Sequence, residues 1–382
     1  MSTITPSDWY VLAEPESIVS PALLVYRERL TANIEAAIKR CGSAQRLRPH
    51  VKTHKSADVV ALHIERGVTQ FKCSTIREAE MIAGAGGDDI LLAYQPAGPG
   101  MERVLSFRKQ YPHIRFGCLV DNTATLNSLE ILAEHRGAHI LVYIDLDVGM
   151  HRTGIAPGTA ADELYRRAAS ARWLEIGGIH AYDGHIKESD FALRGTAAAK
   201  SRNMALSMRA RMLAEGLPVP EIVLGGTPTF PCHADAVLEI KEMDDELQKT
   251  VRLSPGTYPY ADWGYSTGFP DLPFQAAALV LGRVISVPEP GRFTIDVGSK
   301  AIGADPPQPR GTLLNLPEAS AGPQSEEHWV FTIKPELTPS IGTAVYVWPK
   351  HICPTVEHYD QAACIDARGR LTQWWPVTAR GH

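Results

Sequence analysis

The sequence feature that most constrains the fold is a series of short apolar runs that alternate with longer segments of helical period. This alternation is typical of βα units that form a parallel sheet. Eight such runs between about residues 45 and 256 predict eight strands that close into a (β/α)₈ barrel. The runs are LRPHV (47–51), QFKC (70–73), DILLA (89–93), IRFGCLV (114–120), ILVYID (140–145), EIGGIHA (175–181), EIVLG (221–225) and VRLS (251–254).

The segments between these runs predict the helices that cover the sheet. Residues 57–66, 76–83 and 124–134 place apolar side chains at the i, i+3, i+4 spacing that buries one helix face. An open doubly wound sheet is the competing architecture. Polar or glycine-rich loops directly follow each run, as they do at the C-terminal rim of a barrel, where active sites are assembled, and they favour the barrel.

The sequence pattern changes after about residue 270, where β-branched and polar residues alternate between Gly and Pro turns. Segments such as ALVLGRVISV and TAVYVWPKHICPTV show little helical periodicity and predict an antiparallel β domain. We therefore expect an α/β protein with a (β/α)₈ TIM-type barrel over residues 22–270. The β domain is expected over residues 271–382, together with 1–21.

Charge and composition exclude several classes of partner. The formal net charge of −5 leaves no basic excess for a nucleic acid, and the longest apolar stretches are far too short for a membrane helix. The N-terminus lacks the basic start and apolar run of a secretory signal, so we expect a cytoplasmic protein. The six scattered cysteines are expected to be reduced thiols.

The first candidate site is RPHVKTHK, residues 48–55, at the end of the first predicted barrel strand. Crowding of Lys52 by His50, His54, Lys55 and Arg48 would favour the neutral amine that forms a Schiff base. Taken alone, a lysine-rich octapeptide is more often a solvated basic turn. Lys52 therefore needs support from other motifs.

That support comes from VLGGTPT (223–229) and SPGTY (254–258), which follow the seventh and eighth predicted strands. Gly225, Gly226, Thr227, Gly256, Thr257 and Tyr258 provide backbone N–H groups and hydroxyls for an anion. A phosphate site after strands 7 and 8 recurs in barrels. Two such loops and the lysine after strand 1 favour a phosphorylated cofactor.

Two further motifs follow the fifth and sixth predicted strands. DLDVGMHRTGI (145–155) supplies Arg152, which could bind an anionic oxygen or form a salt bridge at the rim to Asp145 or Asp147. GGIHAYDGH (177–185) supplies His180, Tyr182 and His185. Each of these three is as often a satisfied core polar group as a ligand-binding residue.

The last candidate site is WPKHICPTVEHYD, residues 348–360, in the predicted β domain. If this segment is extended, His351 and Cys353 share one face and form an imidazole and thiolate pair that suits Zn²⁺. With only two protein ligands, water and substrate would complete the shell, as in catalytic sites. From H-x-C alone, a buried cysteine beside a surface histidine is the more common arrangement.

Together these motifs resemble the fold-type III pyridoxal 5'-phosphate (PLP) enzymes, specifically the D-serine dehydratase and D-threonine aldolase group related to alanine racemase. RPHVKTHK, GMHRTG, the YDGH region, GGTPT, PGTY and HICPTV carry the resemblance, in this order and over nearly the whole chain. The sequence departs from the group in small ways near YDGHIKESD.

The resemblance implies a role for each matching residue. Lys52 would form the internal aldimine with PLP, and Arg152 and Tyr182 would lie at the cofactor ring. Gly225 to Thr227 and Gly256 to Tyr258 would hold the phosphate. His351 and Cys353 would bind a divalent metal, with Zn²⁺ expected first and Mn²⁺, Co²⁺ or Mg²⁺ as alternatives.

The resemblance also implies the reaction. H-x-C is typical of the dehydratases of this group, whereas the aldolases carry H-x-D, so Cys353 favours dehydration of a β-hydroxy D-amino acid. The expected substrate is D-threo-3-hydroxyaspartate, which would give oxaloacetate and ammonia. D-serine dehydration, a D-threonine-type aldol cleavage, a racemase and a non-enzymatic PLP carrier are the alternatives. A homodimer is expected from the resemblance alone.

Overall fold

The structure is a computed structural model that describes residues 8–240 and 245–381 and divides into two compact units. The first unit contains the chain up to Ala36, residues 53–58 and residues 257–381, and the second contains residues 37–52 and 59–256. The expected domain boundaries differ from this division because residues 22–36 group with the C-terminal residues. Residues 1–7 and 382, which the expected ranges include, lie outside the described residues.

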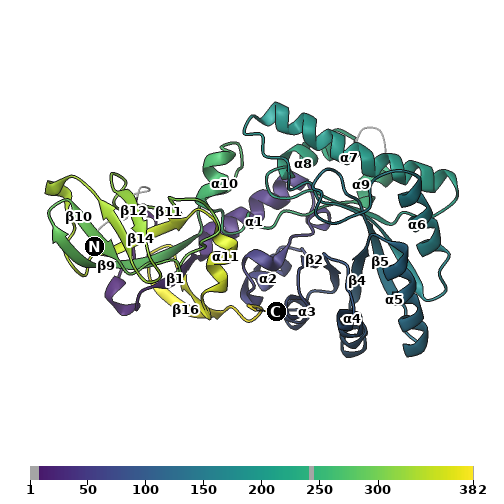
Figure 1. Cartoon of the computed structure of the whole chain (residues 1–382), viewed down its shortest axis with the longest axis horizontal. Helices are drawn as coiled ribbons and strands as arrows, with labels where there is room; N and C mark the ends of the chain where they lie inside the picture. Colours follow the sequence, from purple (N-terminus) through teal and green to yellow (C-terminus); the bar gives the residue numbers. More distant parts are fainter. Residues whose placement is uncertain (1–7, 241–244, 382) are drawn as a thin grey trace. The chain divides into compact units, whose positions relative to one another are not determined.

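The second unit is built on a parallel sheet of seven strands, which lie in the sheet in the order of the sequence. Each strand falls on one of the predicted apolar runs, and the interior of the sheet is apolar around Leu91, Leu119 and Val223. Figure 1 shows α4 (Pro99–Gln110), α5 (Thr123–Arg136) and α6 (Thr159–Ala169) beside strands β4 and β5. The strands are β2 (Gln70–Cys73), β3 (Asp89–Leu92), β4 (Arg115–Val120), β5 (Ile140–Asp145), β6 (Leu174–Ala181), β7 (Glu221–Leu224) and β8 (Val251–Leu253).

The segment 47–50 closes this sheet into a barrel. Leu47 forms a parallel bridge with Leu253 of β8, and His50 forms a parallel bridge with Lys72 of β2. The Arg48 backbone N–H donates to the carbonyl of Leu253, and the Lys72 N–H donates to the carbonyl of Pro49. The segment thus occupies the place of the first barrel strand and bonds to both edges of the sheet, which confirms the expected α/β barrel.

The helices begin and end where local side chains satisfy their free backbone groups. The Thr75 hydroxyl accepts from the N–H of Glu78 at the start of α3, and Asn122 caps α5 in the same way. Gly137 ends α5 in the left-handed conformation. The helices are α1 (Arg27–Cys41), α2 (Ala57–Ile64), α3 (Ile76–Gly84), α4 (Pro99–Gln110), α5 (Thr123–Arg136), α6 (Thr159–Ala169), α7 (Phe191–Ala214), α8 (Phe230–Ile240) and α9 (Asp245–Thr250).

A buried ionic cluster joins the N-terminal ends of the barrel strands. The Arg48 guanidinium has no exposed surface and donates to Asp89 at 2.8 Å and to Glu221 at 2.9 Å. Asp89 begins β3 and Glu221 begins β7, so one guanidinium ties two strands to the closing segment. Burial alone would raise the pKa of Asp89, but the charges of Arg48 and Arg115 hold this pKa below its usual value.

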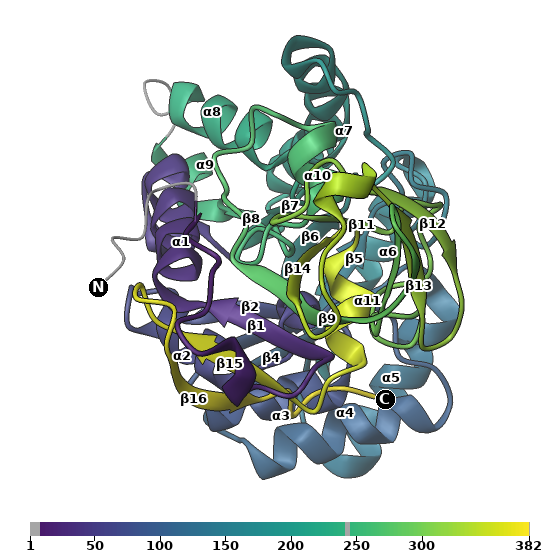
Figure 2. The ribbon, with the colours of Figure 1, turned by 90° about the vertical axis from the view of Figure 1, so that its left-hand side faces the viewer.

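The first unit contains a mixed sheet in the order β12-β13-β10-β9-β1-β15-β16, with β14 paired to β9 and β11 paired to β14. Figure 2 shows β1 between β9 and β15. The sheet is not purely antiparallel as expected, because β1 runs parallel to β15. Its strands are β1 (Ala22–Tyr26), β9 (Ala278–Glu289), β10 (Arg292–Ile295), β11 (Gly311–Leu313), β12 (Ser320–Gln324), β13 (Trp329–Thr332), β14 (Ala344–Pro349), β15 (Gln361–Ile365) and β16 (Leu371–Pro376).

Burial explains why β1 belongs to this sheet. All five of its residues, Ala-Leu-Leu-Val-Tyr, are buried, so the strand needs a neighbour on each edge and apolar cover on both faces. It pairs with β9 and β15 and packs into a cluster that includes Leu12 and Tyr346. A second cluster, around Trp329 and Phe293, forms the core at β10 and β13.

Among the described residues, no helix combines the length and the apolar character that crossing a membrane would require.

We predict that Arg48→Met destabilises the protein by about 3–5 kcal/mol, because it removes the fully buried cation that Asp89 and Glu221 share and leaves them with the more exposed Arg115. Urea denaturation followed by circular dichroism measures this loss. Arg136→Met is the matched control, since Arg136 forms an exposed ion pair with Glu102 and should leave the midpoint nearly unchanged. Equal midpoints for Arg48→Met and the wild type would contradict the role of Arg48.

Candidate active site

Lys52 lies directly after the segment that closes the barrel, in a short 3₁₀ turn over Val51–Thr53. Its side chain is half-buried. Its backbone N–H donates to His50 Nδ1 at 3.3 Å, and His50 Nε2 lies 3.3 Å from the hydroxyl of Ser74, which follows β2. The turn is thus held to the barrel rim, where side chains from the ends of neighbouring strands converge.

Arg48 and Lys55 were expected to crowd Lys52 with positive charge, and this expectation is wrong for both. Arg48 points into the carboxylate cluster with Asp89 and Glu221, and the ammonium of Lys55 pairs with Glu357 at 2.8 Å in the first unit. Both charges are therefore compensated. The 3₁₀ turn over Val51–Thr53 separates Arg48 from Lys55, so residues near in sequence lie in different parts of the fold.

A lysine that the sequence analysis missed lies in the barrel interior. Lys72 of β2 is 2% exposed, and its Nζ lies 3.4 Å from His180 Nε2. His180 Nδ1 in turn lies 2.6 Å from the carboxylate of Asp145, at the end of β5. The only signal in the sequence was one lysine inside the apolar run QFKC, which gave no indication of its partners.

Burial is the main cause that lowers the pKa of Lys72, to about 7. The positive charges of Lys52 and Arg152 lower it further, and the carboxylates of Asp145 and Asp183 oppose these effects. Burial also lowers the pKa of His180, against the opposing charge of Asp145. This interior is therefore a place where an ammonium group can lose its proton near neutral pH.

Tyr182 and Arg152 meet at the same rim. The Arg152 guanidinium carbon lies 5.0 Å from the centre of the Tyr182 ring, and Lys72 Nζ lies 5.7 Å from it. Arg152 is exposed and forms no ion pair with a carboxylate of the described residues, whereas Asp145 and Asp147 bind His180 and His151. The alternative of a salt bridge from Arg152 to either aspartate is therefore wrong, and its guanidinium is left for an anionic ligand.

The loop Gly225 to Thr227 follows β7 and has a buried polar support. Gly225 has φ +73°, and a Cβ at this position would come within 2.7 Å of the His233 ring, so only glycine fits without a shift. Asp183 accepts from the Thr229 hydroxyl at 2.7 Å and lies 2.7 Å from His233 Nε2. The loop is thus fixed from behind by groups that the sequence analysis did not identify.

The second predicted anion loop begins at Ser254, directly after β8. Its hydroxyl is buried and has no hydrogen-bond partner among the residues that the structure describes. The Gly256 N–H donates to the Thr227 hydroxyl at 3.0 Å, which links the two loops within the second unit. Thr257 and Tyr258 belong to the first unit and are both buried.

His351 and Cys353 do not lie on an extended strand, so the expected shared strand face is wrong. His351 is the extended residue before α11 (Ile352–Glu357), and Cys353 lies in its first turn. The two side chains nevertheless interact. The Asp262 carboxylate, which caps α10 (Trp263–Gly268), also accepts from the Ile352 N–H at 3.2 Å and thereby fixes this turn.

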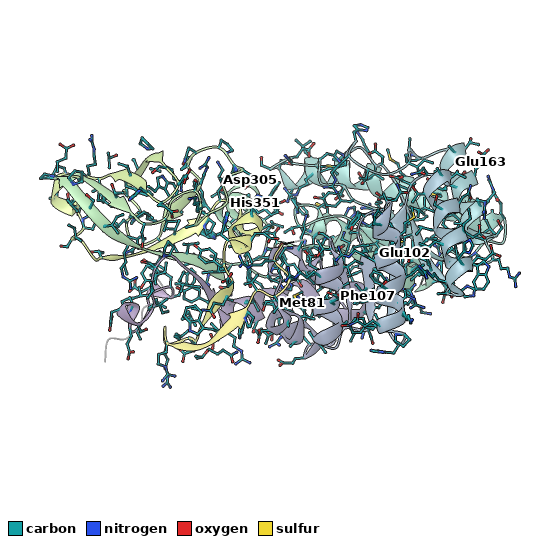
Figure 3. All side chains as sticks on the ribbon, turned by 60° about the horizontal axis from the view of Figure 1, so that its bottom comes forward. Met81, Glu102, Phe107, Glu163, Asp305 and His351 are labelled. Atoms are coloured by element: carbon teal, nitrogen blue, oxygen red, sulfur yellow. The ribbon has the colours of Figure 1, made fainter. Side chains whose placement is uncertain are left out.

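Asp305 is a further residue of this cluster that the sequence did not reveal. Its carboxylate lies 2.5 Å from His351 Nδ1, and Figure 3 shows the two side chains next to each other. Burial would lower the pKa of His351, but the hydrogen bonds and charges of Cys353 and Asp305 raise it to about 9. No group of three or more metal-ligating side chains occurs among the described residues, so a metal here would keep positions open for water or substrate.

The Cys353 thiol also contacts two threonines of the first unit. The Thr53 hydroxyl lies 3.1 Å from Cys353 Sγ, and the Thr257 hydroxyl lies 3.9 Å from it. Thr53 is the residue after Lys52, and Thr257 is the residue after Gly256. The two residues that contact Cys353, the predicted metal ligand, therefore each follow a predicted cofactor residue in the sequence.

Two family models match the chain. The model of the alanine racemase N-terminal domain matches residues 25–242, more than half of the sequence, and that of a putative serine dehydratase domain matches residues 277–365. The chain belongs to the alanine racemase-like family. This result confirms the resemblance to the D-serine dehydratase and D-threonine aldolase group.

Relatives over nearly the full length include both dehydratases and aldolases. The alanine racemase-like chain is 25% identical to D-threonine aldolase of Arthrobacter sp, covering 88% of this chain and 85% of the relative. It is 24% identical to D-threo-3-hydroxyaspartate dehydratase of Delftia sp. strain HT23, covering 93% and 96%. The solved D-threonine aldolase of Filomicrobium marinum superposes with a TM-score of 0.85 at 26% identity, covering 95% and 96%.

Proposed function

We propose that this chain is a dehydratase that uses PLP and a divalent metal to convert a β-hydroxy D-amino acid into a 2-oxo acid and ammonia. The proposed substrate is D-threo-3-hydroxyaspartate, and the product would then be oxaloacetate. We also propose that the enzyme is a cytoplasmic homodimer. The family supports the lyase class, whereas its substrate differs among relatives that act as dehydratases and as aldolases.

The residues of the second unit fit PLP. The loop Gly225 to Thr227 and the N–H of Gly256 offer backbone donors for a phosphate, and Gly225 has the conformation that such a loop requires. The buried Ser254 hydroxyl lacks a partner among the described residues, and a buried polar group of this kind needs a ligand to satisfy it. Lys52 would bind the aldehyde carbon, with Arg152 and Tyr182 at the ring.

The residues of the first unit fit a divalent metal. Histidine and cysteine form a borderline-soft donor pair that favours Zn²⁺, with Mn²⁺, Co²⁺ or Mg²⁺ as alternatives. Asp305 binds Nδ1 of His351 and leaves Nε2 for the metal, which is the arrangement that carboxylates adopt behind metal-bound histidines.

The observation that carries the proposal is the contact between Thr53 and Cys353. The hydroxyl of the residue that follows Lys52 lies 3.1 Å from the thiol that would bind the metal. This contact lies within the first unit, and it supports a link along the chain between the proposed cofactor lysine and the proposed metal ligands.

The residues would share the reaction as follows. PLP, when bound, supplies the electron sink that stabilises negative charge at the α-carbon, and the metal supplies a Lewis acid for the β-hydroxyl. Lys52 would accept the α-proton. Arg152 would bind an anionic oxygen, Tyr182 would orient the ring, and Asp305 would hold His351 in one tautomer.

Arg48, Lys55 and Arg152 are the cationic groups of the predicted barrel mouth that could balance a substrate with a second carboxylate. Arg48 and Lys55 are paired with carboxylates, so of these three only Arg152 has no carboxylate partner among the described residues. D-serine dehydration and aldol cleavage are therefore the alternatives that product analysis must separate.

We predict that Lys52 carries the cofactor. Borohydride reduction of the PLP-loaded protein should label Lys52, identified by peptide mapping, because the lysine follows the closing strand at the barrel rim. A Lys52→Arg variant should retain no covalent label. Label on Lys55, or on no residue of 48–55, would contradict the assignment.

We predict that His351→Ala and Cys353→Ala each lose the metal, measured by elemental analysis, and about a hundredfold or more of the activity. Asp305→Asn should weaken metal affinity about 10–100-fold, because it frees the His351 ring. Asp360→Asn is the matched control, since Asp360 is an exposed partner of Arg380. EDTA should abolish dehydration and leave the PLP absorbance, and full activity of a metal-free preparation would refute the site.

We predict that D-threo-3-hydroxyaspartate gives the highest kcat/KM when it is compared with D-serine and D-threonine. Ammonia, oxo acid and aldehyde should be assayed separately for each substrate. Oxaloacetate with an equal amount of ammonia is the expected result. Glyoxylate plus glycine would identify an aldolase, and a much higher kcat/KM for D-serine would identify a D-serine dehydratase.

A further inference from the structure

Lys72 is a buried cation whose role the reaction described above leaves unexplained. It is 2% exposed and lies on β2 inside the barrel, where the neighbouring strands carry leucines such as Leu91 and Leu119. An apolar residue would fill such a position at lower cost, because a buried ammonium loses its hydration. A lysine here therefore indicates a requirement for charge or for a hydrogen-bond donor.

The hydrogen bonds define which partner Lys72 has. His180 Nδ1 donates to the carboxylate of Asp145 at 2.6 Å, so Nε2 of the neutral ring is an acceptor. Lys72 Nζ donates to this nitrogen at 3.4 Å. No carboxylate of the described residues lies within ion-pair distance of Lys72. Among these residues its ammonium therefore has only the His180 imidazole as a hydrogen-bond partner, and its other N–H groups can donate to a ligand.

We propose that Lys72 is a further cofactor-binding residue, whose ammonium binds an anionic oxygen on the ring portion of PLP. The proposal rests on the proposed function, in which Lys52 carries PLP. The ring portion is favoured over the phosphate because Lys72 lies beside the Tyr182 ring, whereas the glycine loops supply the phosphate donors. The charged and titratable groups that face Lys72 are Lys52, Arg152, Asp145, Asp183 and His180.

The electrostatics of Lys72 agree with an anionic ligand. Burial and the charges of Lys52 and Arg152 lower the pKa of Lys72 to about 7, so this amine can lose its proton near neutral pH. An anionic oxygen next to the amine favours the charged form and raises this pKa again. The protonated amine would then add positive charge near Lys52, which favours loss of the proton from the linkage between Lys52 and the cofactor.

The test compares Lys72→Met and Lys72→Arg with the wild type as full-length proteins titrated with PLP. Lys72→Met should bind PLP on the order of tenfold more weakly, as expected for a lost charge-assisted hydrogen bond. In the absorbance spectrum of bound PLP, the midpoint of the pH titration should rise by about one unit. Lys72→Arg keeps the charge and should retain the wild-type midpoint or a lower one.

Controls separate this role from structural and phosphate effects. Lys109→Met replaces an exposed lysine and should change neither quantity. Affinity for inorganic phosphate should be equal in Lys72→Met and the wild type. If Lys72→Met does not fold, Lys72→Gln replaces it, because it keeps a donor and removes the charge, and its midpoint should also rise.

Two results would overturn the inference. Unchanged PLP affinity and midpoint in Lys72→Met, with PLP on Lys52, would show that Lys72 does not serve the cofactor. An equal loss of inorganic phosphate affinity would assign Lys72 to the phosphate instead. Failure of the wild type to take PLP on Lys52 is a different outcome, which would refute the proposed function itself.

Discussion

Closure of the parallel sheet by residues 47–50 is the constraint on which the rest of the second unit depends. The segment bonds to β8 on one side and β2 on the other, and Arg48 adds ion pairs to the first residues of β3 and β7. Because Lys52 follows this segment directly, the same bonds that close the barrel also place the candidate cofactor lysine at its rim. The segment that begins with Arg48, in the ionic cluster at the N-terminal ends of the strands, therefore ends with the candidate cofactor lysine, Lys52, at the opposite end of the barrel.

Much of the barrel could be predicted from the sequence, because strands buried on both faces appear as apolar runs with polar loops after them. The same criterion could not place β1, since Ala-Leu-Leu-Val-Tyr reads as a buried strand wherever its partners lie, and its partners β9 and β15 are more than 250 residues away. The helical turn after His351 could not be predicted from the residues around it. Its capping carboxylate, Asp262, comes from a distant part of the chain, so a short pattern gave no sign of it.

The candidate site was predictable only where a motif supplies the chemistry within a few residues. Glycine loops and a lysine after a strand have this property. Lys72, Asp305 and Asp183 do not have this property, because the role of each depends on a histidine that is distant in the sequence. The partners are His180 for Lys72, His351 for Asp305 and His233 for Asp183. The crowding predicted around Lys52 was wrong in the same sense. Charge that is near in sequence was counted as charge near in space, and Arg48 and Lys55 are neutralised elsewhere.

A pair formed by an aspartate carboxylate and a histidine ring occurs three times in and around the candidate site. Asp145 binds Nδ1 of His180, Asp183 binds Nε2 of His233, and Asp305 binds Nδ1 of His351. In each pair the carboxylate contacts one ring nitrogen, and when the ring is neutral with its proton on that nitrogen, the other nitrogen is an acceptor for a cation. For His180 this cation is the ammonium of Lys72, at 3.4 Å, and for His233 it is the guanidinium of Arg202, at 3.5 Å. His351 also has a carboxylate partner, Asp305, and lies beside the Cys353 thiol, which is a proposed metal ligand and not a cation. A divalent metal would therefore give the third imidazole the kind of partner that the other two already have.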